Sequence, residues 1–201
     1  LYERRWASYL AKTHQNVTHT LEEQVDIDGS IKLLDVSAGT GSISKSLSKT
    51  SLSLDTVVFN DPDTEMLSGG RKQMIREAFD TRTRFSHHVA EDLRIEDESF
   101  DIILSSNAFH RYSDQNKFLM EAYRCLKPEG YLLVQDWNND SWFRPIFWMI
   151  NQFESKLCAI SLSDLKRRAA NTGFAPIICK RWSWRYWLFY TCVFQKSLSN
   201  I

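Results

Sequence analysis

The sequence lacks an excess of charge of either sign, because 25 Lys and Arg residues balance 25 Asp and Glu residues. A chain without net charge has no overall field that attracts a polyanion, so we expect no nucleic-acid partner. Acidic residues are also missing from positions 165–201, where the basic ones are Lys166, Arg167, Arg168, Lys180, Arg181, Arg185 and Lys196. This basic and aromatic C-terminal segment leaves weak contact with a membrane surface as an alternative role.

Long hydrophobic runs and closely spaced cysteines are absent as well. The longest nearly apolar stretch, Trp187–Phe194, is far shorter than the roughly 20 residues that a membrane helix requires. No secretory signal is visible at the start, although the missing initial Met means that one could have been removed. The four cysteines are separated by 33, 21 and 13 residues, which fits neither a zinc site nor a small disulfide scaffold. We therefore expect reduced thiols and a cytoplasmic protein.

What is present indicates one folded α/β domain. The 201 residues are 43% hydrophobic and 13% aromatic, which excludes a disordered chain. Short apolar runs alternate with helical patterns, which predicts a Rossmann-like, doubly wound, mostly parallel sheet of seven strands. The expected strands are 31–36, 56–59, 84–89, 100–104, 131–135, 176–184 and 186–195. The last two are nearly contiguous, so we expect them to form an antiparallel hairpin at one edge of the sheet.

The turn after the first strand, Asp35-Val36-Ser37-Ala38-Gly39-Thr40-Gly41, is the most informative segment. Its glycines allow a ligand to approach the backbone at the start of a helix. The dinucleotide pattern G-x-G-x-x-G is incomplete, because Ser44 stands at its third glycine. A carboxylate at position 35 would repel a pyrophosphate and attract a cation. The turn therefore favours a positively charged ligand over a nicotinamide dinucleotide.

Two further acids follow the next two strands. Asp61, before Pro62, is placed to accept both hydroxyls of a ribose, as acids do in other adenosine-binding α/β folds. Asp92, before Leu93, follows the third expected strand. Three acids at three successive strand ends predict one ligand site at the carboxyl edge of the sheet.

These motifs resemble the class I S-adenosylmethionine-dependent methyltransferases, in particular the small-molecule group similar to methyltransferase type 11. The first motif of that family reads D-x-G-x-G-x-G, and Ser37 stands at its first glycine. Residues 99–110 look like its fourth strand and following loop, and residues 126–134 are similar to its L-K-P-G-G turn and fifth strand, with Glu129 for one glycine. The resemblance implies S-adenosylmethionine as cofactor and an Asp92 that bonds the adenine. It assigns cofactor binding to Asp35, Ser37, Ala38, Gly39, Gly41, Asp61, Pro62, Asp92, Leu93 and Asn107.

We expect a single methyltransferase domain over residues 1–201. Residues 1–25 would form an N-terminal lid helix, 31–136 the cofactor-binding core, 137–160 an aromatic lid helix, and 163–196 a closing helix and the hairpin. The expected reaction is methyl transfer to O, N or C of a small aromatic or lipid-like acceptor. Two alternatives stay open: a partner-binding or regulatory subunit that binds the cofactor without methylating, and an enzyme of other chemistry that uses the sulfonium charge. The sequence carries no signal for the oligomeric state.

His110 is the candidate general base, because it follows the fourth strand and its ordinary pKa near 6.5 suits proton transfer. The alternative is a histidine that only shapes the pocket wall or bonds the cofactor; Tyr9, Tyr112 and Asp136 are lesser candidates. No metal is expected. His87 and His88 would point to opposite faces of a strand, and an Asn-rich turn explains Asp136, Asn138, Asn139 and Asp140 as well as a magnesium site does.

Six of the seven tryptophans lie between positions 137 and 187. A predicted helix over 142–153 would present its aromatic residues as one stripe. We expect the acceptor to bind against aromatic side chains, with Tyr9, Trp137 and Trp148 as the substrate contacts. Ordinary packing in the hydrophobic core is the alternative explanation.

Overall fold

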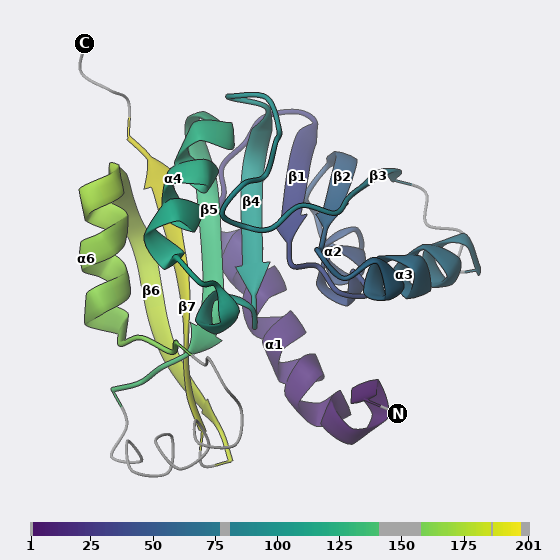
Figure 1. Cartoon of the computed structure of the whole chain (residues 1–201), viewed down its shortest axis with the longest axis horizontal. Coiled ribbons are helices and arrows are strands. Elements are labelled where there is room, and N and C mark those ends of the chain that lie inside the picture. The colour runs from purple at the N-terminus through teal and green to yellow at the C-terminus, as the bar shows by residue number, and fades with distance from the viewer. Residues whose placement is uncertain (1, 77–80, 141–157, 186, 198–201) are drawn as a thin grey trace.

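The computed structural model describes residues 2–76, 81–140, 158–185 and 187–197. One sheet carries seven strands in the order β3-β2-β1-β4-β5-β7-β6 (Figure 1). The strands are β1 (Ile31–Val36), β2 (Leu54–Asn60), β3 (Arg82–Ser86), β4 (Phe100–Ser106), β5 (Leu126–Trp137), β6 (Phe174–Trp184) and β7 (Trp187–Lys196). β1 to β5 pair in parallel, whereas β7 runs antiparallel to both β5 and β6. The predicted Rossmann-like sheet with a C-terminal antiparallel hairpin is confirmed.

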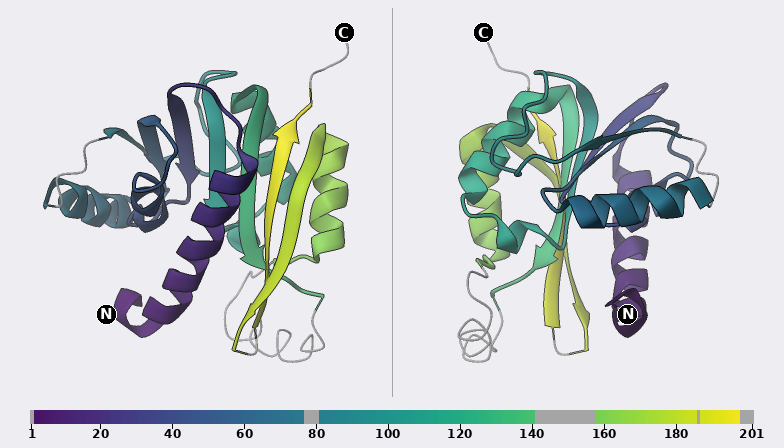
Figure 2. Two further views of the ribbon diagram at one scale, coloured as in Figure 1. Left: turned by 180° about the vertical axis from the view of Figure 1, so that it is seen from behind. Right: turned by 45° about the vertical axis from the view of Figure 1, so that its right-hand side comes forward.

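Helices cover both faces of this sheet. They are α1 (Tyr2–Gln24), α2 (Ser42–Leu47), α3 (Thr64–Arg76), α4 (Gln115–Cys125) and α6 (Leu162–Thr172), with the short 3-10 helix η1 (Phe109–Arg111). α4 and α6 lie on one face, and α1 crosses the other (Figures 1 and 2). The N-terminal half of α1 projects past the sheet at the same end as the tip of the β6–β7 hairpin (Figure 2). None of the described helices has the length and apolar character to span a membrane.

The core consists of one apolar layer on each face of the sheet. Leu34, Phe118 and Leu165 belong to the layer under α4 and α6, and Val17 and Leu21 of α1 belong to the opposite layer. In α1 the buried residues recur every three or four positions: Tyr9, Thr13, Val17, Thr20 and Leu21. This spacing is the helical period, so α1 is an amphipathic helix, and the N-terminal helix expected over residues 1–25 is present, while its role as a lid stays a prediction.

Two sequence-based predictions differ from the structure. β3 ends at Ser86, so His87 and His88 lie beyond the strand, and their rings stack 5.2 Å apart instead of pointing to opposite faces. The expected turn at 127–130 lies within β5, because Leu126 already pairs with Phe100 and the next pair is Ile102 with Tyr131. One residue of β4, Asp101, thus faces residues 127–130 of β5, and the extra residues form a bulge in which Glu129 has a φ of 63°.

The basic charge of the C-terminal segment is largely paired with acids from the rest of the chain. Lys180 contacts Glu23 of α1 at 2.9 Å, and Arg181 contacts Asp140 at 2.8 Å. Lys196 lies 3.5 Å from Glu98 and donates to the carbonyl of Leu126 at 2.7 Å. Three of the seven basic residues of this segment therefore attach the hairpin to the rest of the protein.

Candidate active site

The turn between β1 and α2 has a backbone that most residues avoid. Ser37, Gly39 and Gly41 all have positive φ values, of 58°, 56° and 70°. The Gly41 amide donates to the Ala38 carbonyl at 2.8 Å, and a Cβ atom added to Gly41 would lie 2.6 Å from the Phe59 ring. Glycine at 41 is thus required by both conformation and space, whereas Ser37 adopts a left-handed conformation that costs an L-residue about 1–2 kcal/mol.

Asp61 closes this turn from the end of β2. Its Oδ2 atom accepts a hydrogen bond from the Gly39 amide at 2.8 Å, and its Oδ1 atom accepts one from the Asp63 amide at 2.9 Å. The amide of Ala38 donates to the carbonyl of Asn60 at 3.0 Å, which ties the turn to β2 a second time. The structure therefore brings Asp61 and the glycine turn together, as the motif spacing predicts.

Asp35 lies beneath the turn and is almost fully buried. Its Oδ2 atom accepts a hydrogen bond from the Ser44 hydroxyl at 2.6 Å. The pKa of Asp35 is raised to about 7, mainly by burial and to a smaller extent by the nearby charge of Asp61, against the lowering effect of the Ser44 hydrogen bond. Two neighbouring carboxylates in a buried setting favour a cationic ligand, because such a ligand would relieve their repulsion.

The loop after β4 lies over the same turn. Tyr112, which follows η1, has its hydroxyl 2.8 Å from the Ser105 hydroxyl and within hydrogen-bonding range of the Ser37 side chain. Burial raises the pKa of Tyr112 above its ordinary range, so its hydroxyl stays protonated. Tyr112 thus connects the turn to the segment that carries His110.

His110 forms a buried pair with Asp136 at the end of β5. The Nδ1 atom of His110 lies 2.7 Å from Oδ1 of Asp136, and the backbone N–H of His110 donates to Oδ2 at 2.8 Å. The backbone N–H of Trp137 also donates to Oδ1, at 2.6 Å. An ionised carboxylate accepts hydrogen bonds only, so Nδ1 of His110 carries the proton and Nε2 is left as the basic atom.

A second polar pair closes the site from α1. The Tyr9 hydroxyl donates to Oδ1 of Asn107, and the Asn107 amide donates to the carbonyl of Gln135 at 2.9 Å. Asn107 has a positive φ of 57°. The pKa of Tyr9 is raised above its ordinary range, first by burial and then by the charge of Asp136. The N-terminal helix therefore contributes a neutral donor at the ends of β4 and β5.

Aromatic side chains continue from this pair along the hairpin. Trp137 stacks on His110 with ring centroids 5.1 Å apart and on Trp187 at 5.4 Å. Phe189 stacks on Trp182 at 4.5 Å and contacts Tyr9 at 5.1 Å. We call these residues, with Trp184 beside Tyr9, the aromatic array: Tyr9, Trp137, Trp182, Trp184, Trp187 and Phe189. The structure thus joins two of the predicted substrate contacts, and the third, Trp148, lies outside the described residues, as does the predicted 142–153 helix.

Three further residues that were predicted to bind the cofactor, Pro62, Asp92 and Leu93, make no described side-chain contact with the glycine turn. The carboxylate of Asp92 is exposed and pairs with Arg94 at 2.9 Å. The side chain of Leu93 is fully buried in the core, and its amide donates to Glu121 at 2.9 Å. Pro62 is exposed beside Asp61. None of the described contacts connects Asp92 or Leu93 to the glycine turn, so their assignment to the cofactor stays a prediction.

The oxygen atoms considered for magnesium have partners within the protein. Asp136 holds His110, Oδ1 of Asn138 accepts from the amides of Asp140 and Leu162, and Asp140 pairs with Arg181. Across the described parts of the chain, no three His, Cys, Asp or Glu residues group as metal ligands do. Asn138 and Asp140 therefore fix the loop after β5.

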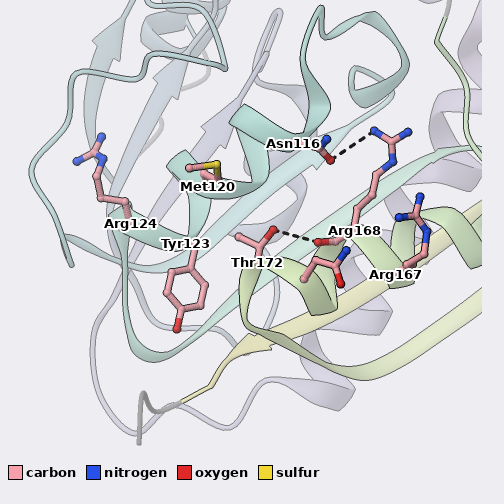
Figure 3. Close-up of a pocket in the computed structure, with 8 residues that line it drawn as sticks. Asn116, Met120, Tyr123, Arg124, Arg167, Arg168 and Thr172 are labelled. Carbon is pink, nitrogen blue, oxygen red and sulfur yellow. Dashed lines mark hydrogen bonds between the residues drawn. The ribbon is translucent and has the colours of Figure 1, made fainter. Parts of the chain in front are cut away.

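A groove of about 610 Å³ lies elsewhere, between α4 and α6 (Figure 3). Met120 and Tyr123 of α4 face Arg167, Arg168 and Thr172 of α6 across it. It includes none of the predicted site residues.

No motif of the sequence indicates a contribution from Ser106 at the end of β4. Its hydroxyl donates to Oε1 of Gln135 at 2.5 Å, and only the β4–β5 register places these two residues side by side.

Comparison with known proteins agrees with this geometry. The chain is 27% identical over 146 residues to the ubiquinone/menaquinone biosynthesis C-methyltransferase UbiE of Xylella fastidiosa. The aligned region covers 72% of this chain and 53% of that protein. It is 32% identical over 160 residues to phthiotriol/phenolphthiotriol dimycocerosates methyltransferase 1 of Mycobacterium ulcerans, covering 80% of this chain and 54% of the relative. The chain thus spans about half the length of these curated relatives.

A solved structure shows the same fold. The phosphoethanolamine N-methyltransferase 2 of Haemonchus contortus, in complex with phosphomonomethylethanolamine and S-adenosylhomocysteine, superposes with a TM-score of 0.77 at 17% identity. The match covers 91% of this chain and 53% of that one. The family model of the methyltransferase domain matches residues 34–134, which include Asp35, the turn 37–41, Asp61, Asp92 and His110 and stop before Asp136. The chain belongs to the methyltransferase domain family.

Proposed function

We propose that this protein binds S-adenosylmethionine at the turn 37–41 and transfers its methyl group to a small apolar acceptor. The observation that carries the proposal is the hydrogen bond between Asp61 and the Gly39 amide, which places an acid from β2 against the glycine turn of β1. The family match and the neighbour in complex with S-adenosylhomocysteine support the choice of cofactor. When bound, the cofactor supplies a methyl group activated by a sulfonium charge.

The residues of the turn suit a cationic adenosine ligand. Asp61 has two carboxylate oxygens, as a pair of ribose hydroxyls requires. Positive φ values at Ser37, Gly39 and Gly41 leave the backbone open to close approach. The charge of Asp61 and the ionised form of Asp35 attract a cation and disfavour a pyrophosphate, and a bound cation would in turn favour ionisation of Asp35. We further propose that residues 31–136 hold the cofactor.

We assign the acceptor to the space between α1, the loop after β4 and the hairpin. Nε2 of His110 would take the proton of a protonated acceptor, while Asp136 holds the ring and stabilises its charged form. The aromatic array would hold a flat or isoprenoid body and exclude water from the reacting atoms. Relatives whose names refer to quinone and dimycocerosate methylation support an apolar acceptor.

One observation supports a second function, in which the protein binds the cofactor without transferring its methyl group. Ser37 occupies a position where the family motif has glycine, and it does so with a φ of 58°. A chain that binds the cofactor without methylating would tolerate such a departure. Detection of cofactor binding without turnover on any quinone or lipid acceptor would favour that alternative.

Calorimetric titration with S-adenosylmethionine and S-adenosylhomocysteine tests the proposal. We expect one site per chain, and Asp61→Ala should weaken binding by about 1.5–3 kcal/mol, which is typical of a charge-assisted hydrogen bond. Asp55→Ala is the matched control, because Asp55 carries the same charge at the start of the same strand. It should leave the affinity unchanged. Absence of binding of both compounds to the folded wild type at millimolar concentration would contradict the proposal.

A further inference from the structure

Two of the four free cysteines face each other across the β6–β7 hairpin. Cys179 of β6 is the direct register partner of Cys192 of β7. Directly opposed residues of antiparallel strands have Cα atoms about 4.5–5.5 Å apart. A disulfide requires a Cα separation of about 4.4–6.8 Å. The backbone of the hairpin is therefore already in the range that a cross-strand disulfide needs.

The side chains of this pair also interact. As directly opposed residues of antiparallel strands they point to the same face of the hairpin, where each thiol affects the pKa of the other. Cys192 is fully buried, whereas Cys179 is partly exposed. The hydrogen bond from Cys192 and then the charge of Lys166 on α6 lower the pKa of Cys179, against the effect of burial. Burial raises the pKa of Cys192. The accessible thiol is thus the better nucleophile, and its partner is protected from solvent.

We propose that Cys179 and Cys192 are a redox-active dithiol. They form a reversible cross-strand disulfide with each other when a low-molecular-weight disulfide, such as oxidised glutathione, oxidises them. The Cys179 thiolate attacks one sulfur of glutathione disulfide, which releases one glutathione thiolate and leaves a mixed disulfide. Cys192 then loses its proton and attacks the sulfur of Cys179, which releases the second glutathione. Two protein thiols are oxidised to one disulfide, and one glutathione disulfide is reduced to two thiols.

The other two cysteines do not share this arrangement. Cys125 is buried at the end of α4, and burial raises its pKa to about 11, so it is unreactive. Cys158 is exposed and would form an unrelated glutathione adduct. We therefore use Cys158→Ser as the background in which the pair is tested.

The disulfide would fix the hairpin beside the aromatic array. Three positions beyond the cysteines, Trp182 pairs with Phe189, and the Trp182 indole donates to Thr191 at 3.0 Å. Closing the loop between residues 179 and 192 removes freedom from the unfolded chain, so oxidation should raise the melting temperature, roughly by 5–10 °C. The inference does not depend on the proposed methyl transfer.

The test is to incubate folded Cys158→Ser protein with excess oxidised glutathione and to map its peptides. Trypsin cleaves after Arg168, Lys180, Arg185 and Lys196, so the two cysteines fall in separate peptides. We expect a linked peptide pair 169–180 with 186–196, loss of two of the three remaining thiols, and a raised melting temperature. A reductant should reverse all three changes.

Single variants in the same background provide the controls. Cys179→Ser should abolish both the linked peptide pair and the consumption of oxidised glutathione by this pair. Because Cys179 is partly exposed, this variant should fold normally. Cys192→Ala should stop the reaction at a glutathione adduct on Cys179. If the protein with both cysteines ends as that same adduct, or if both thiols persist in excess oxidant, the proposal is wrong.

Discussion

The Nδ1 atom of His110 lies 2.7 Å from the Oδ1 atom of Asp136, and both side chains are buried. His110 follows β4 and Asp136 ends β5, so the pair spans two neighbouring parallel strands. Asp136 accepts two further hydrogen bonds, from the backbone amides of His110 and Trp137. This arrangement fixes the imidazole ring and presents Nε2 as its basic atom.

Replacement of Asp136 tests that role. Asp136→Asn should lower turnover by about 10–100-fold with little change in the dissociation constant of the cofactor, since the variant loses the charge that orients and stabilises the ring. His110→Ala should lower it by about 100-fold. Asp101→Asn, at the start of β4, is the control, because it also removes a carboxylate that holds a basic group. Equal turnover for Asp136→Asn and the control would show that His110 is not a general base and only lines the pocket.

Two residues with positive φ stand where the family motifs have glycine. Ser37 has a φ of 58° and Glu129 has a φ of 63°. Ser37→Gly and Glu129→Gly should each raise the free energy of unfolding, by about 1 kcal/mol, because glycine adopts this conformation without strain. Ser46→Gly, inside α2, should lower it by about the same amount. Urea denaturation measures all three, and destabilisation by Glu129→Gly, which removes an exposed side chain, would contradict the positive φ at this position.

Asp35 predicts a dependence of stability on pH. Its pKa is raised to about 7 in the folded protein from 3.8, so the folded state favours the neutral acid. The stability that this group contributes is present below about pH 4 and is lost as the pH rises through 7, a change on the order of 4 kcal/mol. Asp35→Asn should therefore gain stability relative to the wild type between pH 4 and pH 8. A difference that stays constant over this range would contradict the raised pKa.

The same residue predicts a proton linked to cofactor binding. A sulfonium and an ammonium near Asp35 would favour its charged form, so binding near pH 6.5 should release a proton. Calorimetry in phosphate and in imidazole buffer, which differ in ionisation enthalpy, detects this release as a difference in the observed enthalpy. Asp35→Asn should remove the difference while Asp55→Ala keeps it. Equal enthalpies in the two buffers for the wild type would place the cationic groups away from Asp35.

The aromatic array predicts selectivity for the acceptor. Trp137 stacks on both His110 and Trp187, so Trp137→Ala should raise the Michaelis constant of an apolar quinone acceptor by about tenfold or more. Tyr9→Phe keeps the ring contact with Phe189 and removes the hydrogen bond to Asn107, so it should have a smaller effect. The Michaelis constant of the cofactor should change little in either variant. Equal increases for cofactor and acceptor would indicate that these residues only support the fold.

Much of this architecture was predictable because its signals are local. The alternation of apolar runs and helices gives the parallel sheet, and the short gap between the last two strands gives the hairpin. The contact of Asp61 with the turn follows from the parallel pairing of β1 and β2, whose carboxyl ends must meet at one edge.

Other contacts depend on register and packing that no local pattern encodes. The bulge at 127–130 sets which residue of β5 lies beside which residue of β4, and so decides that Asp136 reaches His110. The turn residues Lys127, Pro128, Glu129 and Gly130 predict a connection, but not that it forms within the strand. Asp92 is exposed and pairs with Arg94, two residues further along the loop, and the spacing of the motifs does not predict this contact.

A crystal structure in complex with S-adenosylhomocysteine tests the central claim most directly. We predict that both ribose hydroxyls lie within hydrogen-bonding distance of the Asp61 carboxylate and that the amino acid portion lies against residues 37–41. The sulfur atom should face His110 and the aromatic array. A ligand bound in the groove between α4 and α6, or a turn that keeps its hydrogen bond to Asp61 and stays empty at saturating ligand, would contradict the assignment.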